Sequence, residues 1–296
     1  MEQELATLSE LLNPLEKQLL AKKEQSALPI FFIMGCARSG TTLIFQYLSR
    51  SGIFCYPTNF LSRFFFAPTV GGRLQRMLFD YDLRNELGEA VKNSDFSSAL
   101  GKTSGILSPN EFWYFWRRFF DFPDQQVIPE QQLAAIDVET FISELSSFQA
   151  LYDMPFLAKG GICNWHIPFL SQISPRIHFI FVYRDTASNA SSLVAARESF
   201  FGDSTSWYSF KPPGYKDVIS EPPIIQTQWQ VAETNRAISE GLQMVSSSRQ
   251  ISISYEEFCD KPRAFVESAC DLFNLPTPNS LFELPERFPR RGGSDT

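Results

Sequence analysis

The most informative stretch of this 296-residue chain reads Pro29-Ile-Phe-Phe-Ile-Met-Gly35-Cys-Ala-Arg-Ser-Gly40-Thr-Thr42. It begins as a continuous apolar run of strand length, passes through two glycines with four residues between them, and leads into a segment of helical character at 41–48. Glycines let backbone amides turn inward, and the N-terminus of a helix adds the positive end of its dipole. A strand, a glycine-bearing loop and a helix in this order therefore predict a phosphate-binding loop, and the alternative is a tight turn that binds nothing.

The elements on either side of this loop alternate between apolar strands and helices. We predict strands at 155–159, 177–183 and 251–255, and helices at 164–172, 187–199, 224–245 and 262–274. Strands that are apolar on both faces and alternate with helices are typical of a parallel sheet covered on both sides. The prediction is an α/β fold, a P-loop-type three-layer domain with a central parallel sheet flanked by helices. It spans 28–296 as one domain and carries a helical insertion at about 53–150.

Residues 1–27 are expected to form a separate N-terminal segment. Leucines at positions 5, 8, 12, 15 and 19 recur at helical spacing on one stripe, which predicts an amphipathic helix over 4–24. Pro14 is expected to bend or split this helix. Such a helix would pack either on the domain or on a second copy of the chain, and the second case would make the protein a homodimer.

The charge balance excludes several classes of partner. With a net charge of −7 the chain lacks the basic excess of a nucleic-acid-binding protein, and a polyanionic acceptor is disfavoured as well. Five scattered cysteines without a C-x-x-C pair predict buried thiols in a reducing compartment. Two histidines without a Cys/His cluster argue against a zinc site. The acidic N-terminus does not resemble a signal peptide, and no stretch approaches the ~18 apolar residues of a membrane span, so we predict a soluble, cytoplasmic protein.

The phosphate loop departs from that of nucleoside triphosphatases at one position. Thr41 stands where their loop carries a lysine, so the charge that would follow β- and γ-phosphates is missing. The pentapeptide Arg38-Ser-Gly-Thr-Thr42 instead resembles the loop with which the PAPS-dependent sulfotransferase family grips the 5′-phosphosulfate of its donor, 3′-phosphoadenosine 5′-phosphosulfate (PAPS). The resemblance implies that the donor is bound by Arg38, Ser39, Gly40, Thr41 and Thr42.

A second motif extends this resemblance. Arg184 follows the predicted strand 177–183 and Ser192 comes eight residues later, which is the spacing of the family's pair that contacts the 3′-phosphate. Arginine can fork onto phosphate oxygens, and open α/β sheets place ligand groups at the ends of their strands. The alternative for Arg184 is a surface salt bridge with Asp185.

Two weaker matches carry the resemblance further along the chain. Ser254-Tyr-Glu-Glu-Phe258 resembles a family segment whose tyrosine lies near the adenine, while an ordinary core aromatic is the other interpretation of Tyr255. Lys159, at the end of a predicted strand, resembles the family's catalytic lysine. With Arg38 and Thr42 it would neutralise the charge that grows on the bridging oxygen during transfer.

The general base is the open position in this resemblance. Many family members use a Glu or His soon after the loop helix, but the matching stretch 56–63 contains neither. Glu111 is our first substitute, because a carboxylate flanked by aromatics could sit in an apolar cleft that raises its pKa. The alternative interpretation is that Glu111 lies in the first turn of a helix after Ser108-Pro109, where its carboxylate interacts with the helix dipole. His166 is the second candidate, with a structural role as its alternative.

These residues together predict transfer of a sulfuryl group from PAPS to a hydroxyl, or an amino, group of a small-molecule acceptor. The product would be adenosine 3′,5′-diphosphate, and no metal is required because the sulfonate carries less charge than a triphosphate. Two other functions stay open: a P-loop kinase-like phosphotransferase and a non-catalytic nucleotide-binding member. The expected partner is a small molecule, neither a nucleic acid nor a membrane, and the negative net charge favours neutral or cationic acceptors.

Overall fold

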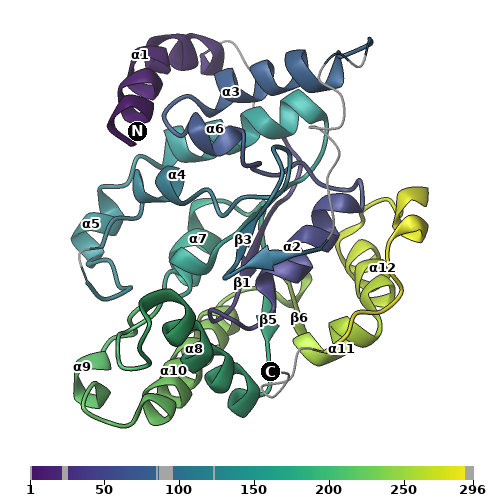
Figure 1. Ribbon diagram of the computed structural model, residues 1–296. Helices are drawn as coiled ribbons and strands as arrows, with labels where there is room; N and C mark the ends of the chain where they lie inside the picture. Colours follow the sequence, from purple (N-terminus) through teal and green to yellow (C-terminus); the bar gives the residue numbers. More distant parts are fainter. Residues whose placement is uncertain (1, 22–25, 85, 87–95, 123, 291–296) are drawn as a thin grey trace.

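The computed structural model of the chain describes residues 2–21, 26–84, 86, 96–122 and 124–290, and it has an α/β fold with a four-stranded central sheet (Figure 1). The order of the strands is β4-β1-β5-β6, and all neighbouring strands are parallel. Their bounds are β1 Ile30–Met34, β4 Phe156–Lys159, β5 Ile177–Tyr183 and β6 Gln250–Ser254. The predicted fold, a parallel sheet flanked by helices, is confirmed.

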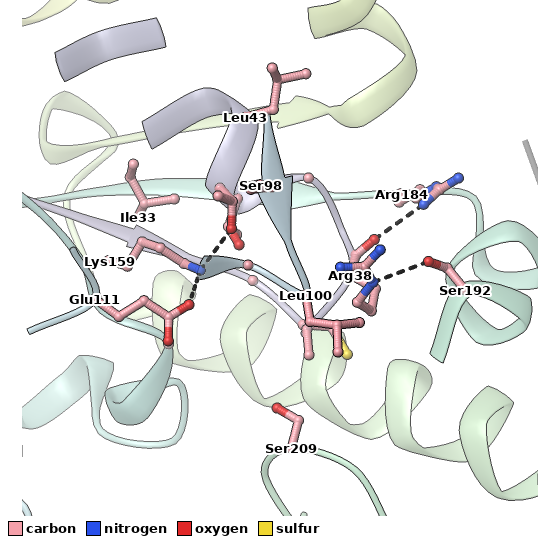
Figure 2. A pocket seen from close by; sticks show the side chains of 18 of the residues that line it. Ile33, Arg38, Leu43, Ser98, Leu100, Glu111, Lys159, Arg184, Ser192 and Ser209 are labelled. Atoms are coloured by element: carbon pink, nitrogen blue, oxygen red, sulfur yellow. Dashed lines mark hydrogen bonds and ion pairs between the residues drawn. The ribbon is translucent and has the colours of Figure 1, made fainter. Parts of the chain in front are cut away.

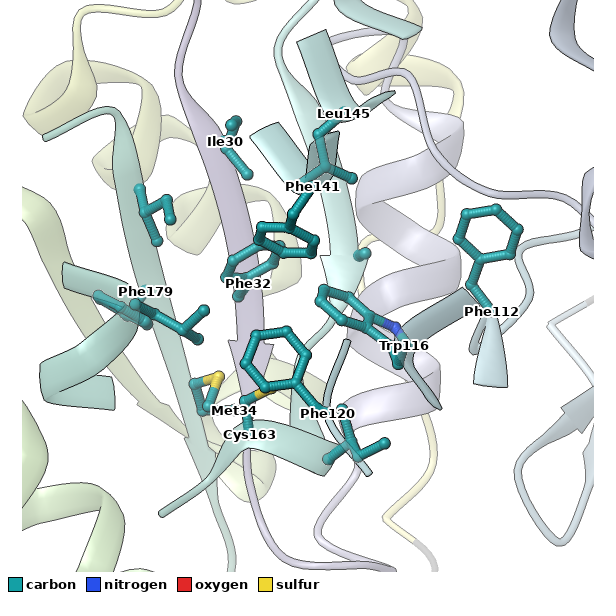
Figure 3. Packing of buried hydrophobic residues seen from close by; sticks show 14 of the residues in the cluster. Ile30, Phe32, Met34, Phe112, Trp116, Phe120, Phe141, Leu145, Cys163 and Phe179 are labelled. Atoms are coloured by element: carbon teal, nitrogen blue, oxygen red, sulfur yellow. The ribbon is translucent and has the colours of Figure 1, made fainter. Parts of the chain in front are cut away.

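The two faces of the sheet are covered by different helices, which explains why the strands are apolar throughout. Ile30, Phe32 and Met34 of β1 face one side, and Phe31 and Ile33 face the other; all five are fully buried. The first face packs against α4 (Trp113–Arg117), α6 (Val138–Tyr152), α7 (Ile167–Ile173) and α10 (Pro223–Gln243), with the aromatic packing shown in Figure 3. The second face packs against α2 (Thr41–Arg50), α11 (Tyr255–Asp260) and α12 (Pro262–Phe273).

The register of the strands brings four chain segments to one edge of the sheet. Ile33 of β1 is the partner of Lys159 at the end of β4, and Tyr183 at the end of β5 is the partner of Ser254 at the end of β6. Because the strands are parallel, everything that follows a strand leaves from the same edge. The loop after β1, the end of β4 and the segments after β5 and β6 therefore meet there.

Most predicted elements are present, with shifted ends. The helix after β5 is α8 (Thr186–Phe201), and Asp185 caps it because its carboxylate accepts a hydrogen bond from Ser188 N at 2.8 Å. The strand predicted at 251–255 ends one residue earlier, because Ser254 caps α11 with its hydroxyl and Tyr255 is already helical. The helix predicted from residue 164 begins at Ile167, after the 3-10 turn η4 (Gly161–Cys163).

The region 53–150 is mostly helical and irregular, as expected. It contains a short antiparallel hairpin that was not predicted, formed by β2 (Ser98–Ala99) and β3 (Lys102–Thr103). The other short elements here are η1 (Leu61–Arg63), α3 (Pro68–Gln75), the π-helical turn η2 (Arg76–Asp80) and α5 (Glu130–Ala134). Beyond this region lie α9 (Tyr215–Val218), η5 (Ser247–Arg249) and η6 (Asn279–Glu283).

The N-terminal helix α1 (Glu2–Leu20) packs on the domain beside α3 and α6. Of the two expected effects of Pro14, bending or splitting, the helix is not split, and Figure 1 shows it bent. Proline removes one donor from the helical ladder, and tertiary contacts offset this loss. One such contact is made by Glu16, which is buried and whose two carboxylate oxygens accept hydrogen bonds from Thr69 N and Val70 N, at 2.8 and 2.9 Å.

Candidate active site

A cavity of about 1240 Å³ opens at the edge of the sheet where the strands end. Nine of the eleven predicted site residues line it: Arg38, Gly40, Thr41, Thr42, Glu111, Lys159, Arg184, Ser192 and Tyr255. The other two, Ser39 and His166, are buried and do not line it. The sheet edge therefore gathers into one space residues that are far apart in the sequence.

The loop between β1 and α2 has the backbone of an anion-binding turn. Arg38 and Gly40 have positive φ angles, 66° and 99°, and Ser39 N donates to Cys36 O at 3.2 Å to close the turn. Gly40 is the N-cap of α2, and a Cβ atom there would lie 2.4 Å from the Tyr255 ring, so only glycine fits. The first amides of a helix have no partners within it, so the N-terminus of α2 offers donors to an anion.

Arg38 and Arg184 form a cationic cluster at one end of the cavity (Figure 2). Arg38 Nε donates to Ser192 Oγ at 3.3 Å, and Arg184 Nη1 donates to Arg38 O at 3.2 Å. The Arg184 guanidinium also lies 4.7 Å from the centroid of the Tyr255 ring, and its Nε is 3.9 Å from the Glu256 carboxylate. Arg184 is buried, so it is not the surface residue of the salt-bridge alternative.

Lys159 and Glu111 meet on the other side of the loop (Figure 2). Lys159 Nζ, at the end of β4, forms an ion pair with Glu111 Oε1 and donates to Thr42 Oγ1 at 3.1 Å. The two expectations for the surroundings of Glu111 are both wrong. Its side chain is 50% exposed rather than enclosed in an apolar cleft, and α4 begins only at Trp113. The reason is that Phe112 turns into the core, while Glu111 faces the cavity.

The sequence model described as the sulfotransferase family matches residues 29–279. The chain belongs to the sulfotransferase family. The crystal structure of sulfotransferase STF9 from Mycobacterium avium is similar with a TM-score of 0.55 and 14% identity, covering 88% of this chain and 67% of that chain. Sulfotransferase STF1 from Mycobacterium tuberculosis H37Rv has a TM-score of 0.55 and 11% identity, covering 94% and 74%. These likenesses show the fold alone. A comparison with curated proteins found no match.

His166, the second candidate base, has a structural contact in this sulfotransferase-family fold. Its side chain is buried, and its Nε2 accepts a hydrogen bond from Ile128 N at 2.9 Å. Burial lowers the pKa of His166 to about 4, so the ring is neutral at pH 7. This arrangement corresponds to the structural alternative for His166 and favours Glu111 as the base.

The low pKa of His166 predicts a pH dependence of stability. Between about pH 6.5 and 4 the unfolded chain binds a proton at this site and the folded chain does not, so stability falls as the pH is lowered. The expected loss is up to about 3 kcal/mol. His166→Gln should be less stable than the original protein at pH 7.5, and this difference should shrink towards pH 4. Urea unfolding at a series of pH values measures it, and a difference independent of pH would contradict the assignment.

Another part of the cavity wall was not predicted at the level of residues. It carries the aromatic side chains of Trp113, Phe122, Tyr208 and Phe210, and the ion pair of Lys211 with Asp124 at 2.8 Å. The density of aromatics at 112–122 was a visible signal. The segment 208–211 has no motif of its own, and only the fold brings it to the same space.

Two further expectations concern metals and membranes. Within the described part of the chain, no group of three His, Cys, Asp or Glu side chains could hold a metal ion. Among the described helices, none is long and apolar enough to span a membrane.

All five cysteines are buried and free, which confirms the prediction of buried thiols.

Proposed function

We propose that this protein transfers the sulfuryl group of PAPS to a hydroxyl group, or an amino group, of a small-molecule acceptor. One observation carries the proposal: Lys159 contacts both Thr42 of the phosphate loop and Glu111 within the cavity that Arg38 and Arg184 also line. Anion-binding groups, a cation for the leaving oxygen and a carboxylate base thus face one space. Sulfuryl transfer needs these three components.

The donor set fits the anionic ends of PAPS. The chain has a net charge of −7, yet Arg38, Lys159 and Arg184 line this cavity together with the N-terminus of α2. The loop 38–42 would hold the 5′-phosphosulfate, with Ser39 acting from beneath it, since its side chain is buried. The 3′-phosphate would bind Arg184 and Ser192, on the side of the cavity away from Lys159. Tyr255 would support Arg184 and the loop next to the adenine.

The bound donor would supply an activated sulfuryl group with a phosphate oxygen as its leaving atom. Lys159 would donate a hydrogen bond to this bridging oxygen as the sulfur–oxygen bond breaks and the electron pair stays on oxygen. Glu111 would take the proton of the acceptor as its oxygen or nitrogen bonds to sulfur. In an in-line transfer the entering and leaving atoms lie on opposite sides of the sulfur, and the contact of Glu111 with Lys159 would keep both the base and the cation next to this one sulfuryl group.

The acceptor would pack against the part of the cavity wall that is formed by Trp113, Phe122, Tyr208 and Phe210. Aromatic walls with a few polar groups are typical of sites for small molecules. No metal is needed for this reaction in our proposal, and a cytoplasmic location, a homodimer and the division of the chain at residue 28 stay predictions from the sequence.

Ligand-induced stabilisation tests the identity of the donor. Adenosine 3′,5′-diphosphate at about 100 times its Kd should stabilise the protein by about 2.7 kcal/mol, seen as a rise of several degrees in Tm. ATP with magnesium should give no comparable rise, because the loop lacks the lysine of triphosphate-binding proteins. A shift with ATP and magnesium alone would instead favour a kinase-like phosphotransferase.

Arg184→Ala locates the binding event within the cavity. It should weaken adenosine 3′,5′-diphosphate binding by about 1.5–3 kcal/mol, because it removes a charge-assisted contact. Arg236→Ala is a matched control, since Arg236 is exposed and paired with Glu233 and Glu240 on the surface of α10. Equal affinity of the Arg184 variant and the control in calorimetry would remove Arg184 from the donor site.

A further inference from the structure

Buried amide side chains hold the phosphate loop from behind. Asn164 makes two hydrogen bonds with Gly35: its Oδ1 accepts from Gly35 N at 3.3 Å, and its Nδ2 donates to Gly35 O at 3.1 Å. Asn189, in α8, donates from Nδ2 to Ala37 O at 2.9 Å. Both asparagines are at most 1% exposed, and neither lines the cavity. These hydrogen bonds therefore lie on the side of the loop that faces away from the cavity.

This placement decides where the loop amides point. In a planar trans peptide the C=O and the following N–H point in opposite directions. Because Ala37 O is held at the buried Asn189, Arg38 N–H points towards the cavity, and Cys36 N–H is turned in the same way by the bond of Asn164 to Gly35 O. Arg38 also has a φ of 66°, which a residue with a side chain adopts only when its surroundings impose it.

We propose that Asn164 and Asn189 are positioning residues for the anionic end of the donor, and this rests on the function proposed above. They act through the backbone of the loop, since neither reaches the cavity. A glycine-bearing loop that is free to move loses conformational entropy when it binds an anion, and this loss weakens binding. Because the two asparagines fix the loop carbonyls before the anion binds, the loss is smaller. Asn189 is the more decisive of the two, because it acts directly before the strained Arg38.

A buried amide outside the site provides a matched control. Gln149, in α6, is fully buried, and its Nε2 donates to Leu28 O at 2.9 Å and Pro29 O at 2.6 Å, just before β1 begins. It holds backbone carbonyls in the way that Asn189 holds the phosphate loop, but neither Gln149 nor the two residues that it holds line the cavity. Its removal should cost stability of the same kind without touching the donor site.

The test is calorimetric titration of the full chain with adenosine 3′,5′-diphosphate, alongside urea unfolding of each variant. Asn164→Ala and Asn189→Ala should each raise the Kd about tenfold, whereas Gln149→Ala should leave it within about twofold at a comparable loss of stability. Asn189→Asp should bind more weakly still, because its carboxylate faces Ala37 O and adds negative charge behind the anion site. The affinity should therefore fall in the order Asn, Ala, Asp at position 189.

Other results would contradict either the positioning role or the proposed function on which it rests. Affinities that follow stability alone, with binding to Gln149→Ala as weak as binding to Asn189→Ala, would overturn the positioning role. Should Asn189→Ala fail to fold, Asn164→Ala and the isosteric Asn189→Asp give the same comparison. If the original protein binds no adenosine 3′,5′-diphosphate, the proposed donor is wrong, and titration with inorganic pyrophosphate then tests the loop independently: equal affinity of all variants for pyrophosphate would overturn the inference.

Discussion

Lys159→Ala should lower turnover about 10²–10³-fold, the usual cost of losing one donor that stabilises a developing negative charge. Lys159 Nζ lies against Thr42 and Glu111 at the carboxyl end of β4, where the leaving oxygen would develop its charge. The measurement is the rate of sulfuryl transfer from labelled PAPS under saturating donor, once an acceptor screen has identified a substrate.

Binding of the product separates this effect from a general loss of the site. Adenosine 3′,5′-diphosphate lacks the sulfonate, so its Kd should change much less than the turnover of Lys159→Ala. Lys17→Ala, which removes an exposed lysine of α1, is the control and should keep normal turnover. Normal turnover in Lys159→Ala would remove this residue from the chemistry, whereas absence of turnover in the original protein would favour a nucleotide-binding member without catalysis.

Glu111→Gln should lower turnover by about 10²–10⁴-fold, the range that a positioned general base contributes. Glutamine keeps the size of the side chain but cannot take the proton of the acceptor. Since Glu111 lies outside the phosphate loop, binding of adenosine 3′,5′-diphosphate should be unchanged. The measurement is turnover with the same acceptor, with binding followed by calorimetry.

Because Glu111 touches Lys159, the double variant is needed to interpret this result. If Glu111 served only to orient Lys159, Lys159→Ala with Glu111→Gln would be no slower than Lys159→Ala alone. A further loss in the double variant supports an independent role as base. If Glu111→Gln retains turnover while His166→Gln abolishes it, the base is His166; if both stay active, the base lies elsewhere in 53–150 or belongs to the acceptor.

Local sequence was sufficient for the framework of the fold. The strand at 177–183 was predicted with the ends that the structure has, because a strand buried on both faces needs a continuous apolar run and is bounded by polar residues. The phosphate loop was predicted for a similar reason, since Gly40 meets a local backbone requirement that is visible as a residue type. Arg184 could be assigned to the cavity because a residue directly after a parallel strand must leave at the ligand-binding edge.

The functional partnerships depend on contacts that no local pattern encodes. Glu111 and Lys159 are 48 residues apart, and nothing in the sequence around either predicts an ion pair between them. The same holds for Asn164 and Asn189, whose amides meet Gly35 and Ala37 across more than a hundred residues. The register of β1 against β4 and β5 decides these pairs, because it sets which residues beyond the strand ends come within hydrogen-bonding distance. Burial likewise follows from packing, which is why the exposure of Glu111 and the enclosure of His166 became visible only in three dimensions.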